Sequence, residues 1–428
     1  MNAMPDTAAR APGTLRGEQA WATAAFTLLF PGFFFYHTAL GLGLSGAFLG
    51  GFFAIVALVF APPLCFIYGY KLKFVPNFLH KSDVFFGLFL AYFLAVVAAN
   101  AGAGANPAIV NNHLLGVLFM VMLFVIFRIA DFDAPAIRRA LLACLLGMSA
   151  VVFTYSVDGV FYLGALGVAR DPQSLATYQG FSRSYLVTFM VFIPYTRALR
   201  WRALLYLLGA PTLFLNTARS EFVAMLFLIP IIELYYSKYK MGAVVLFILF
   251  LAAININIEA LLSALPDNRM LELFDLSQSS SANKRHHLNV LGMQTIAANP
   301  IWGDYGSYAP GHYAHNVFSA WVDLGIFGFF FLLAVLIIPT IGLVLKGYFQ
   351  HQTSGDFLLV FGLTCSTLLL LFTSHYFTDM MIGATLGAYS KYRLGRKYVP
   401  DSAPDFGPPP LRHPDFRQTV SQPGGPRS

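Results

Sequence analysis

The residues best suited to chemistry gather in one polar stretch of the chain, residues 261–314, and at its border. The stretch contains Lys284, Arg285 and His286 in succession, and His315 and Asn316 follow it directly before a long apolar segment. Guanidinium groups bind phosphate oxygens, and a neutral imidazole accepts a proton from a hydroxyl group. The residue types therefore predict a site for an anionic, lipid-borne substrate with a histidine near it.

His315 has two interpretations. We expect it at the N-terminal end of the next helix, where the positive end of the helix dipole disfavours a protonated imidazole. A neutral imidazole near pH 7 is what a general base requires, and Ser319 and Asp323, on roughly the same helix face, could orient it. Alternatively, His315 is a polar boundary residue and Asn316 is a simple N-cap. The residue types leave both open.

A second candidate lies in a tight reversal between two apolar segments, from Asn216 to Glu221. Thr217 or Ser220 can cap the helix that follows, so that free backbone N–H groups and the Arg219 guanidinium would converge on phosphate oxygens. Alternatively, Arg219 and Glu221 neutralise each other as a structural pair.

Inside the polar stretch, we predict a short helix that begins near Ser281 or Asn283 and ends before Asn299-Pro300. It would lie across the outer mouth of the bundle and present Lys284, Arg285 and His286 at its beginning. Its apolar stripe at helical spacing comprises Leu288, Leu291, Thr295 and Ile296. The basic residues either bind substrate or merely contact anionic lipid headgroups.

A further candidate pair lies on the last predicted span. His375 and Asp379, four residues apart, could line the same cavity or form a structural hydrogen bond.

A zinc site from His312 and His315 with His286 or His287 is a weak alternative, because no Glu or Cys lies nearby at familiar ligand spacing. The outer segments also lack an acidic pair of the kind that holds Mg²⁺. We therefore predict no metal and no other cofactor.

The elements that must position these residues are membrane helices. The chain has 428 residues, of which 57% are hydrophobic and only 11% are charged, whereas soluble domains have roughly 25% charged residues. Apolar runs long enough to cross the hydrocarbon core recur along it. Alternating strands are absent, which excludes an outer-membrane barrel, and only helices then satisfy their backbone groups in lipid. The fold class is an all-α integral membrane protein.

The apolar runs predict twelve spans in a membrane domain over residues 19–398, between disordered cytoplasmic tails at 1–18 and 399–428. With the N-terminus cytoplasmic, 21 of the 27 Lys and Arg residues fall on the inner side, which is a strong positive-inside signal. The net charge of +7 is thus mainly a topology signal, and we predict no nucleic-acid partner. The predicted spans are near 20–40, 43–69, 84–101, 108–128, 138–156, 181–197, 201–217, 219–236, 241–260, 315–345, 357–373 and 375–391. The six outer basic residues are Arg170, Arg183, Arg219, Arg269, Lys284 and Arg285.

The second half of the chain carries an ordered set of motifs. They are, in order, Thr217-Ala218-Arg219-Ser220, Arg285, the turn Asn299-Pro300-Ile301-Trp302-Gly303-Asp304-Tyr305-Gly306, Ala314-His315-Asn316 and Leu324-Gly325-Ile326-Phe327-Gly328. This set resembles the O-antigen ligase and O-antigen polymerase superfamily over roughly residues 200–345, and the first six spans match only in being hydrophobic. Two departures are Asp304, where a closer glycine pair is expected, and Leu288 and Leu291, where an aromatic residue often follows the arginine.

The resemblance implies a GT-C-type glycosyltransferase of the bacterial inner membrane, with about twelve transmembrane helices and a large periplasmic loop between helices 9 and 10. Such enzymes transfer a glycan from undecaprenyl diphosphate to an acceptor hydroxyl at the periplasmic face, without metal and with inversion. Arg219 and Arg285 would match the diphosphate-binding arginines, and His315 the catalytic histidine. Arg183, Lys284, His286, Asn316, Glu221 and His375 are further candidates for substrate binding.

Several functions remain open. An O-antigen ligase would use lipid A-core as acceptor, whereas an O-antigen or exopolysaccharide polymerase would use another lipid-linked glycan. Polymerases often have a larger basic loop between the fifth and sixth spans, and the stretch here, 157–180, is short, which favours the ligase. Protein O-oligosaccharyltransferases usually add a C-terminal periplasmic region. A transporter or flippase would place ionisable groups near midplane, but here most lie at the outer face.

Overall fold

The computed structural model describes residues 17–49, 51–170, 172–264, 266, 268, 270–271, 280–348 and 354–397. Across these ranges the protein is all-α except for one short antiparallel pair, β1 (Ser156–Val157) and β2 (Val160–Phe161). Nearly all of both predicted disordered tails, and Arg269, lie outside the described residues. Glu18, which was predicted to end the first tail, instead begins the first helix.

Seven helices are long and apolar enough to cross a membrane in the part of the chain that the structure describes. The protein is therefore a multi-pass membrane protein by helix length and hydropathy. The first of these helices contains a π-helical turn, η1 (Leu28–Gly32), between α1 (Glu18–Thr27) and α2 (Phe33–Gly41). The other six are α3 (Phe53–Phe74), α4 (Lys81–Gly102), α5 (Pro107–Ile129), α6 (Pro135–Tyr155), α13 (Ser319–Leu343) and α14 (Gly355–Thr373).

The other five predicted spans coincide with shorter helices, so the count of twelve stays a prediction. These are α7 (Tyr178–Phe192), α8 (Leu199–Leu215), α9 (Arg219–Tyr236), α10 (Lys240–Ile256) and α15 (Met381–Lys397). Three helices begin later than their predicted spans: α3 at Phe53 rather than near 43, α13 at Ser319 rather than near 315, and α15 at Met381 rather than near 375. His315 and His375 consequently lie in loops.

Small residues let α15 approach α5 closely. A Cβ atom added at Gly383 would lie 1.9 Å from the carbonyl oxygen of Met120, and one at Gly387 would lie 2.2 Å from that of Phe124. Glycines four residues apart on one helix face allow two backbones to pack together inside a membrane bundle. This packing fixes α15 in the core, and with it the loop Ser374–Met380 that precedes α15.

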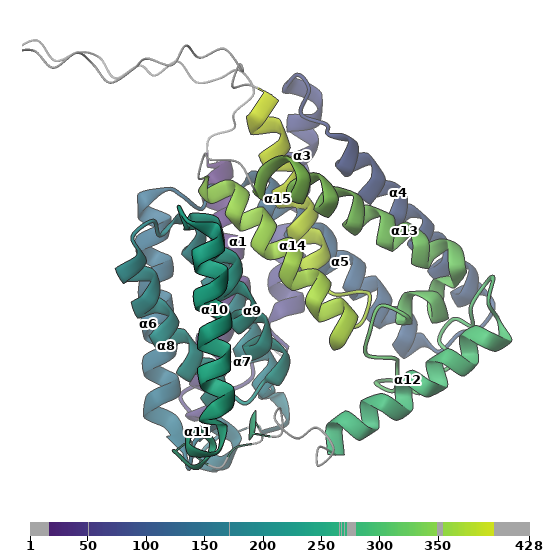
Figure 1. The fold of residues 1–428 in the computed structure, drawn as a ribbon. Coiled ribbons are helices and arrows are strands. Elements are labelled where there is room, and N and C mark those ends of the chain that lie inside the picture. Colours follow the sequence, from purple (N-terminus) through teal and green to yellow (C-terminus); the bar gives the residue numbers. More distant parts are fainter. Residues whose placement is uncertain are drawn as a thin grey trace, which may run out of the picture.

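The polar stretch contains two helices, α11 (Ile258–Ala264) and α12 (Ser280–Ala298). Figure 1 shows α12 at one end of the bundle, where its axis crosses the direction of α13 and α14. We call this end of the molecule the α12 end. By the distribution of basic residues it is the predicted outer end.

Candidate functional site

α12 confirms the helix predicted within the polar stretch. Leu288 and Ile296 are buried, as expected for the stripe that faces the protein, whereas Leu291 is 45% exposed. The helix extends to Ala298, directly before Asn299-Pro300, because a residue before proline is driven away from helical backbone angles. Arg285 thus lies in the first half of a helix that packs against α13.

The turn that follows α12 is packed into a kink of α13. Gly325, inside α13, has a φ angle of 68°, and a Cβ atom there would lie 2.3 Å from the carbonyl oxygen of Ile301. A Cβ atom at Gly303 would in turn lie 2.3 Å from the carbonyl oxygen of Val322. Both positions therefore require glycine, and backbone hydrogen bonds from Asp304 to Val322 and from Ile326 to Ile301 fasten the turn.

A buried aspartate anchors the next part of the loop. Asp323 is fully buried and accepts hydrogen bonds from the backbone N–H of Gly306 at 2.9 Å and from the Tyr308 hydroxyl at 3.0 Å. The Tyr376 hydroxyl also donates to Asp323, and it lies 2.6 Å from Nε2 of His113. These bonds join the loop after α12 to the loop before α15.

The prediction that Ser319 and Asp323 orient His315 is therefore wrong. Asp323 binds tyrosines, and Ser319 donates to the carbonyl oxygen of Asn316 and accepts from the backbone N–H of Phe377. Since α13 begins only at Ser319 and is kinked at Gly325, His315 is not on the helix face that they share.

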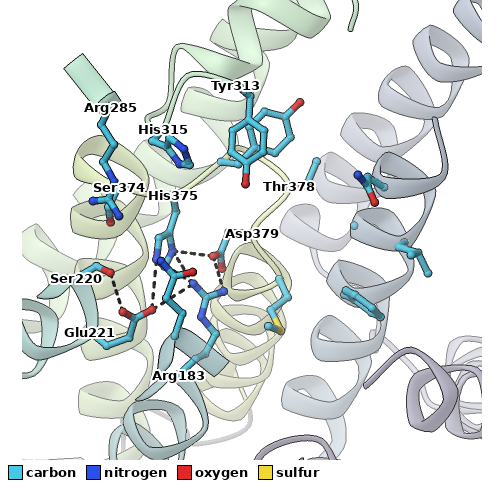
Figure 2. Close-up of a pocket in the computed structure, with 17 residues that line it drawn as sticks. Arg183, Ser220, Glu221, Arg285, Tyr313, His315, Ser374, His375, Thr378 and Asp379 are labelled. Carbon is cyan, nitrogen blue, oxygen red and sulfur yellow. Dashed lines mark hydrogen bonds and ion pairs between the residues drawn. The ribbon is translucent and has the colours of Figure 1, made fainter. Parts of the chain in front are cut away.

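A polar cavity of about 350 Å³ opens at the α12 end, between segments far apart in sequence. Figure 2 shows side chains from α7, α9 and α12 and from the loops before α13 and α15 converging on it. We call it the polar cavity. Its charged and imidazole-bearing residues are Arg183, Glu221, Arg285, His315, His375 and Asp379.

Four of these residues form one charged cluster. A guanidinium nitrogen of Arg183 lies 2.9 Å from a carboxylate oxygen of Asp379 and another lies 3.6 Å from Glu221. His375 joins the same two carboxylates, at 2.7 Å from Asp379 and 3.6 Å from Glu221. Ser220 donates to the other oxygen of Glu221 at 2.7 Å. Figure 2 shows how the two basic groups bridge the two acidic ones.

Exposure shows which member of the cluster faces the cavity. The Arg183 side chain is 22% exposed, compared with 9% for His375, 5% for Asp379 and 1% for Glu221. The carboxylates therefore lie behind Arg183 and hold its guanidinium in place. Removing one partner would leave buried charges without their counter-charges, at a large cost in free energy. The cluster therefore holds this geometry before any ligand binds.

The loop residues of the cluster have perturbed pKa values. Burial and the Arg183 charge lower the pKa of His375, but the Asp379 and Glu221 carboxylates outweigh them and hold it above the ordinary 6.5. For Asp379, burial raises the pKa, and the charges of Arg183 and His375 override this effect and bring it below its ordinary value. His375 is thus protonated to a greater extent at neutral pH than an isolated histidine.

His315 has the opposite electrostatic environment. Burial lowers its pKa to about 4, and the positive charges of Arg285, His375 and Lys284 contribute in the same direction. Its ring lies 4.7 Å from that of Tyr313, centroid to centroid, and no hydrogen bond to the imidazole is present among the described residues. The imidazole is therefore neutral at pH 7 and can accept a proton.

The remaining predicted residues lie around the cavity rather than along its wall. Arg219 begins α9 and is half-buried, next to the wall residue Ser220. Lys284 and His286 are exposed on α12. The Asn316 side chain accepts from the backbone N–H of Phe318 at 3.0 Å, which closes a turn before α13.

The reversal before α9 differs from its prediction. Thr217, with a φ angle of 61°, lies in the turn, and Ala218 occupies the N-cap position without a side-chain hydrogen bond. The predicted capping by Thr217 or Ser220 is wrong, because Ser220 already lies in the helix and binds Glu221. Glu221 is paired with Arg183 and His375 from other elements.

An apolar cavity of about 320 Å³ adjoins the polar one and shares Phe119, Gln179, Arg183 and Met380 with it. We call it the aromatic cavity, because Phe30, Phe33 and Phe53 also line it; the rest of its wall comes from Thr177, Gly180 and Ser184. Pro31 lacks an N–H group, and the helix widens there into the π-helical turn η1 beside these rings. A polar and an apolar compartment thus meet at Arg183.

Several residues in the wall of the polar cavity were not predicted from the sequence. Tyr313, Gln179 and Ser374 line the polar cavity, and no spacing pattern marks them. Asp379 was recognisable only through its spacing from His375. No group of three or more His, Cys, Asp or Glu side chains is placed to hold a metal ion in the described ranges.

Comparisons with known proteins give no match: no family model, no curated protein and no solved structure is similar to this chain. The functional conclusion therefore depends on the site itself and on the motif resemblance.

Proposed function

We propose that the protein is an O-antigen ligase. In this proposal it transfers a polysaccharide from undecaprenyl diphosphate to a hydroxyl group of lipid A-core at the periplasmic face of the bacterial inner membrane. The observation that carries the proposal is the polar cavity, where Arg183, Arg285 and a neutral His315 converge from three separate segments.

His315 is the general base of the proposed reaction. Its neutral imidazole accepts the proton of the acceptor hydroxyl while that oxygen attacks the anomeric carbon of the donor sugar. The new bond joins the acceptor oxygen to the anomeric carbon, and the bond from that carbon to the diphosphate oxygen breaks. Attack from the face opposite the leaving group inverts the anomeric carbon.

Arg285 and Arg183 stabilise the diphosphate that leaves. Negative charge grows on this group as its bond breaks, and a guanidinium group binds two phosphate oxygens at once. Glu221 and Asp379 hold Arg183 in position, and the pKa of His375, raised by the same carboxylates, favours a further positive charge beside it. The cluster is thus built before the donor arrives, which lowers the cost of binding.

The aromatic cavity supports a lipid-borne donor. An isoprenoid diphosphate has a strongly polar head joined to a long apolar tail. The polar cavity fits the head and the aromatic cavity fits the tail, and the two cavities meet at Arg183. Burial of apolar surface against Phe33 and Phe53 would contribute to donor affinity without taking part in the reaction.

Transfer by the purified protein tests the proposal. The protein in detergent, with EDTA present, is given undecaprenyl-diphosphate oligosaccharide and lipid A-core, and the products are separated on a gel. A glycosylated lipid A band that is lost in His315→Ala supports a metal-independent ligase. Ladders built on the donor lipid, without that band, would instead indicate a polymerase that uses the same site. Elution of the variant at the wild-type volume in size-exclusion chromatography shows that it is folded.

A further inference from the structure

A third cavity, of about 430 Å³, lies between α12 and the loop of residues 307–314, and we call it the loop cavity. Leu288, Leu291 and Val322 form its apolar part. Its polar atoms come from amide, hydroxyl, phenol and imidazole side chains, those of His287, Gln294, Thr295, Ser307, Tyr308, His312 and Tyr313.

The loop cavity is joined to the polar cavity through the loop that carries His315. Tyr313 lines both cavities, and Ala314, which directly precedes His315, lines the loop cavity. The rings of Tyr313 and His315 have centroids 4.7 Å apart. His315 therefore stands where the two cavities approach each other, as a base between two substrates must.

The chemistry of the two cavities differs. The polar cavity contains guanidinium groups and carboxylates. The described residues that line the loop cavity provide amide, hydroxyl, phenol and imidazole groups, and none of them is a Lys, Arg, Asp or Glu. Such groups hydrogen-bond an uncharged polyol, and the tyrosine rings offer apolar faces beside polar tips.

Hydrogen bonds and close packing hold two parts of the wall of the loop cavity. Tyr308 is held by Asp323 at 3.0 Å, and the backbone N–H of Gly306 donates to the same carboxylate. On the other side α12 packs closely on the loop, because a Cβ atom at Gly292 would lie only 3.1 Å from that of Ala314. A cavity fixed in this way binds a ligand at little cost in conformational entropy.

We propose that the loop cavity binds the acceptor glycan and presents its hydroxyl group to His315. This inference depends on the proposed function, since it names the second substrate's place at the same site. The chemical class of ligand is an uncharged oligosaccharide segment, and Gln294 and His312 are the residues that recognise it by hydrogen bonds.

Binding of a free oligosaccharide tests this inference without any transfer step. The probe is a hexose oligosaccharide that carries no carboxylate or phosphate group, and saturation-transfer NMR with the protein in detergent measures its affinity in the absence of donor. The Gln294→Leu/His312→Leu variant removes two hydrogen-bonding side chains that are exposed, so that folding is unaffected. Gln173→Leu, at an exposed glutamine before α7 that lines none of the three cavities, is the matched control.

We expect the wild type and Gln173→Leu to bind the oligosaccharide equally and the double variant to bind at least about tenfold more weakly. Equal binding by the double variant, or none by the wild type, would overturn the assignment of the loop cavity. If the wild type binds the oligosaccharide but transfers no glycan from the donor to lipid A-core, the proposed function fails and the cavity assignment stands.

Discussion

The pH dependence of transfer tests the electrostatics of His315 directly. Its pKa is lowered to about 4, so about 90% of the imidazole is neutral at pH 5, whereas about 3% would be neutral at the ordinary value of about 6.5. Protonation removes the base, so activity that depends on the free enzyme must fall as pH decreases through this pKa. We expect the acid limb of kcat/KM near pH 4 rather than near pH 6.5.

The pKa of His315 should differ between the free enzyme and the donor complex. A bound diphosphate brings negative charge into the polar cavity, which favours the protonated imidazole and raises its pKa. Since kcat reports the complex and kcat/KM reports the free enzyme, the acid limb of kcat should lie at higher pH than that of kcat/KM. A base whose pKa moves toward the working pH when substrate binds transfers protons more effectively.

Removing the charge of Arg285 tests how neighbouring charges set the pKa of His315. After burial, its charge is the largest contribution to the lowered pKa of His315. Arg285→Gln should reduce the rate and also move the acid limb of the normalised kcat/KM profile toward pH 6.5, about where an isolated histidine titrates. Arg170→Gln is the matched control, because Arg170 is exposed and does not line the polar cavity.

The assay is radiolabelled glycan transfer at subsaturating donor, between about pH 4 and about pH 8. A wild-type acid limb near pH 6.5, or the same normalised profile in Arg285→Gln and wild type, would refute the electrostatic account of the base.

Three further perturbations follow from the packing. Arg183→Leu should lower the free energy of unfolding by about 3–5 kcal/mol, because it leaves the buried carboxylates without their guanidinium partner. Thermal unfolding in detergent measures the loss, and an unchanged midpoint would contradict this expectation. Gly325→Ala should lower the free energy of unfolding by about 1–3 kcal/mol and abolish transfer, because a Cβ atom at positive φ meets the Ile301 carbonyl oxygen. Wild-type stability and activity of this variant would show that the turn is not needed. Phe33→Ala with Phe53→Ala should raise KM for a long-chain donor but not for a short-chain analogue, and equal effects on both would remove the aromatic cavity from donor binding.

Local sequence patterns were sufficient to locate helices. Apolar runs predicted the membrane helices, and the spacing of Leu288 and Ile296, with Asn299-Pro300 after them, predicted α12. These signals depend on residues within a few turns of one another. Helix starts were less reliable, because α13 and α15 begin four and six residues after their predicted starts at 315 and 375.

A correct helix start does not settle which side chains face a cavity, because successive residues on a helix point about 100° apart. α9 begins at the predicted residue, Arg219, yet Ser220 and Glu221 line the polar cavity while Arg219 does not. The role of Arg219 in diphosphate binding thus stays a prediction. The transfer activity of Arg219→Gln, compared with that of Arg183→Gln, tests it.

The charged cluster could not be predicted from the spacing of residues in the sequence. Arg183 and Asp379 are 196 residues apart, and their contact joins α7 to the loop before α15, which no local pattern relates. Only His375 and Asp379, four residues apart, gave a local signal. At position 304 the backbone N–H donates to the carbonyl oxygen of Val322 and fastens the turn to α13, a bond that does not involve the Asp304 side chain.

The measurement that tests the central claim most directly is a cryo-EM structure of the protein with undecaprenyl diphosphate. The account predicts the two phosphate groups within hydrogen-bonding distance of Arg183 and Arg285, with the first isoprene units against the aromatic cavity. Diphosphate density elsewhere on the molecule, with an empty polar cavity, would contradict it.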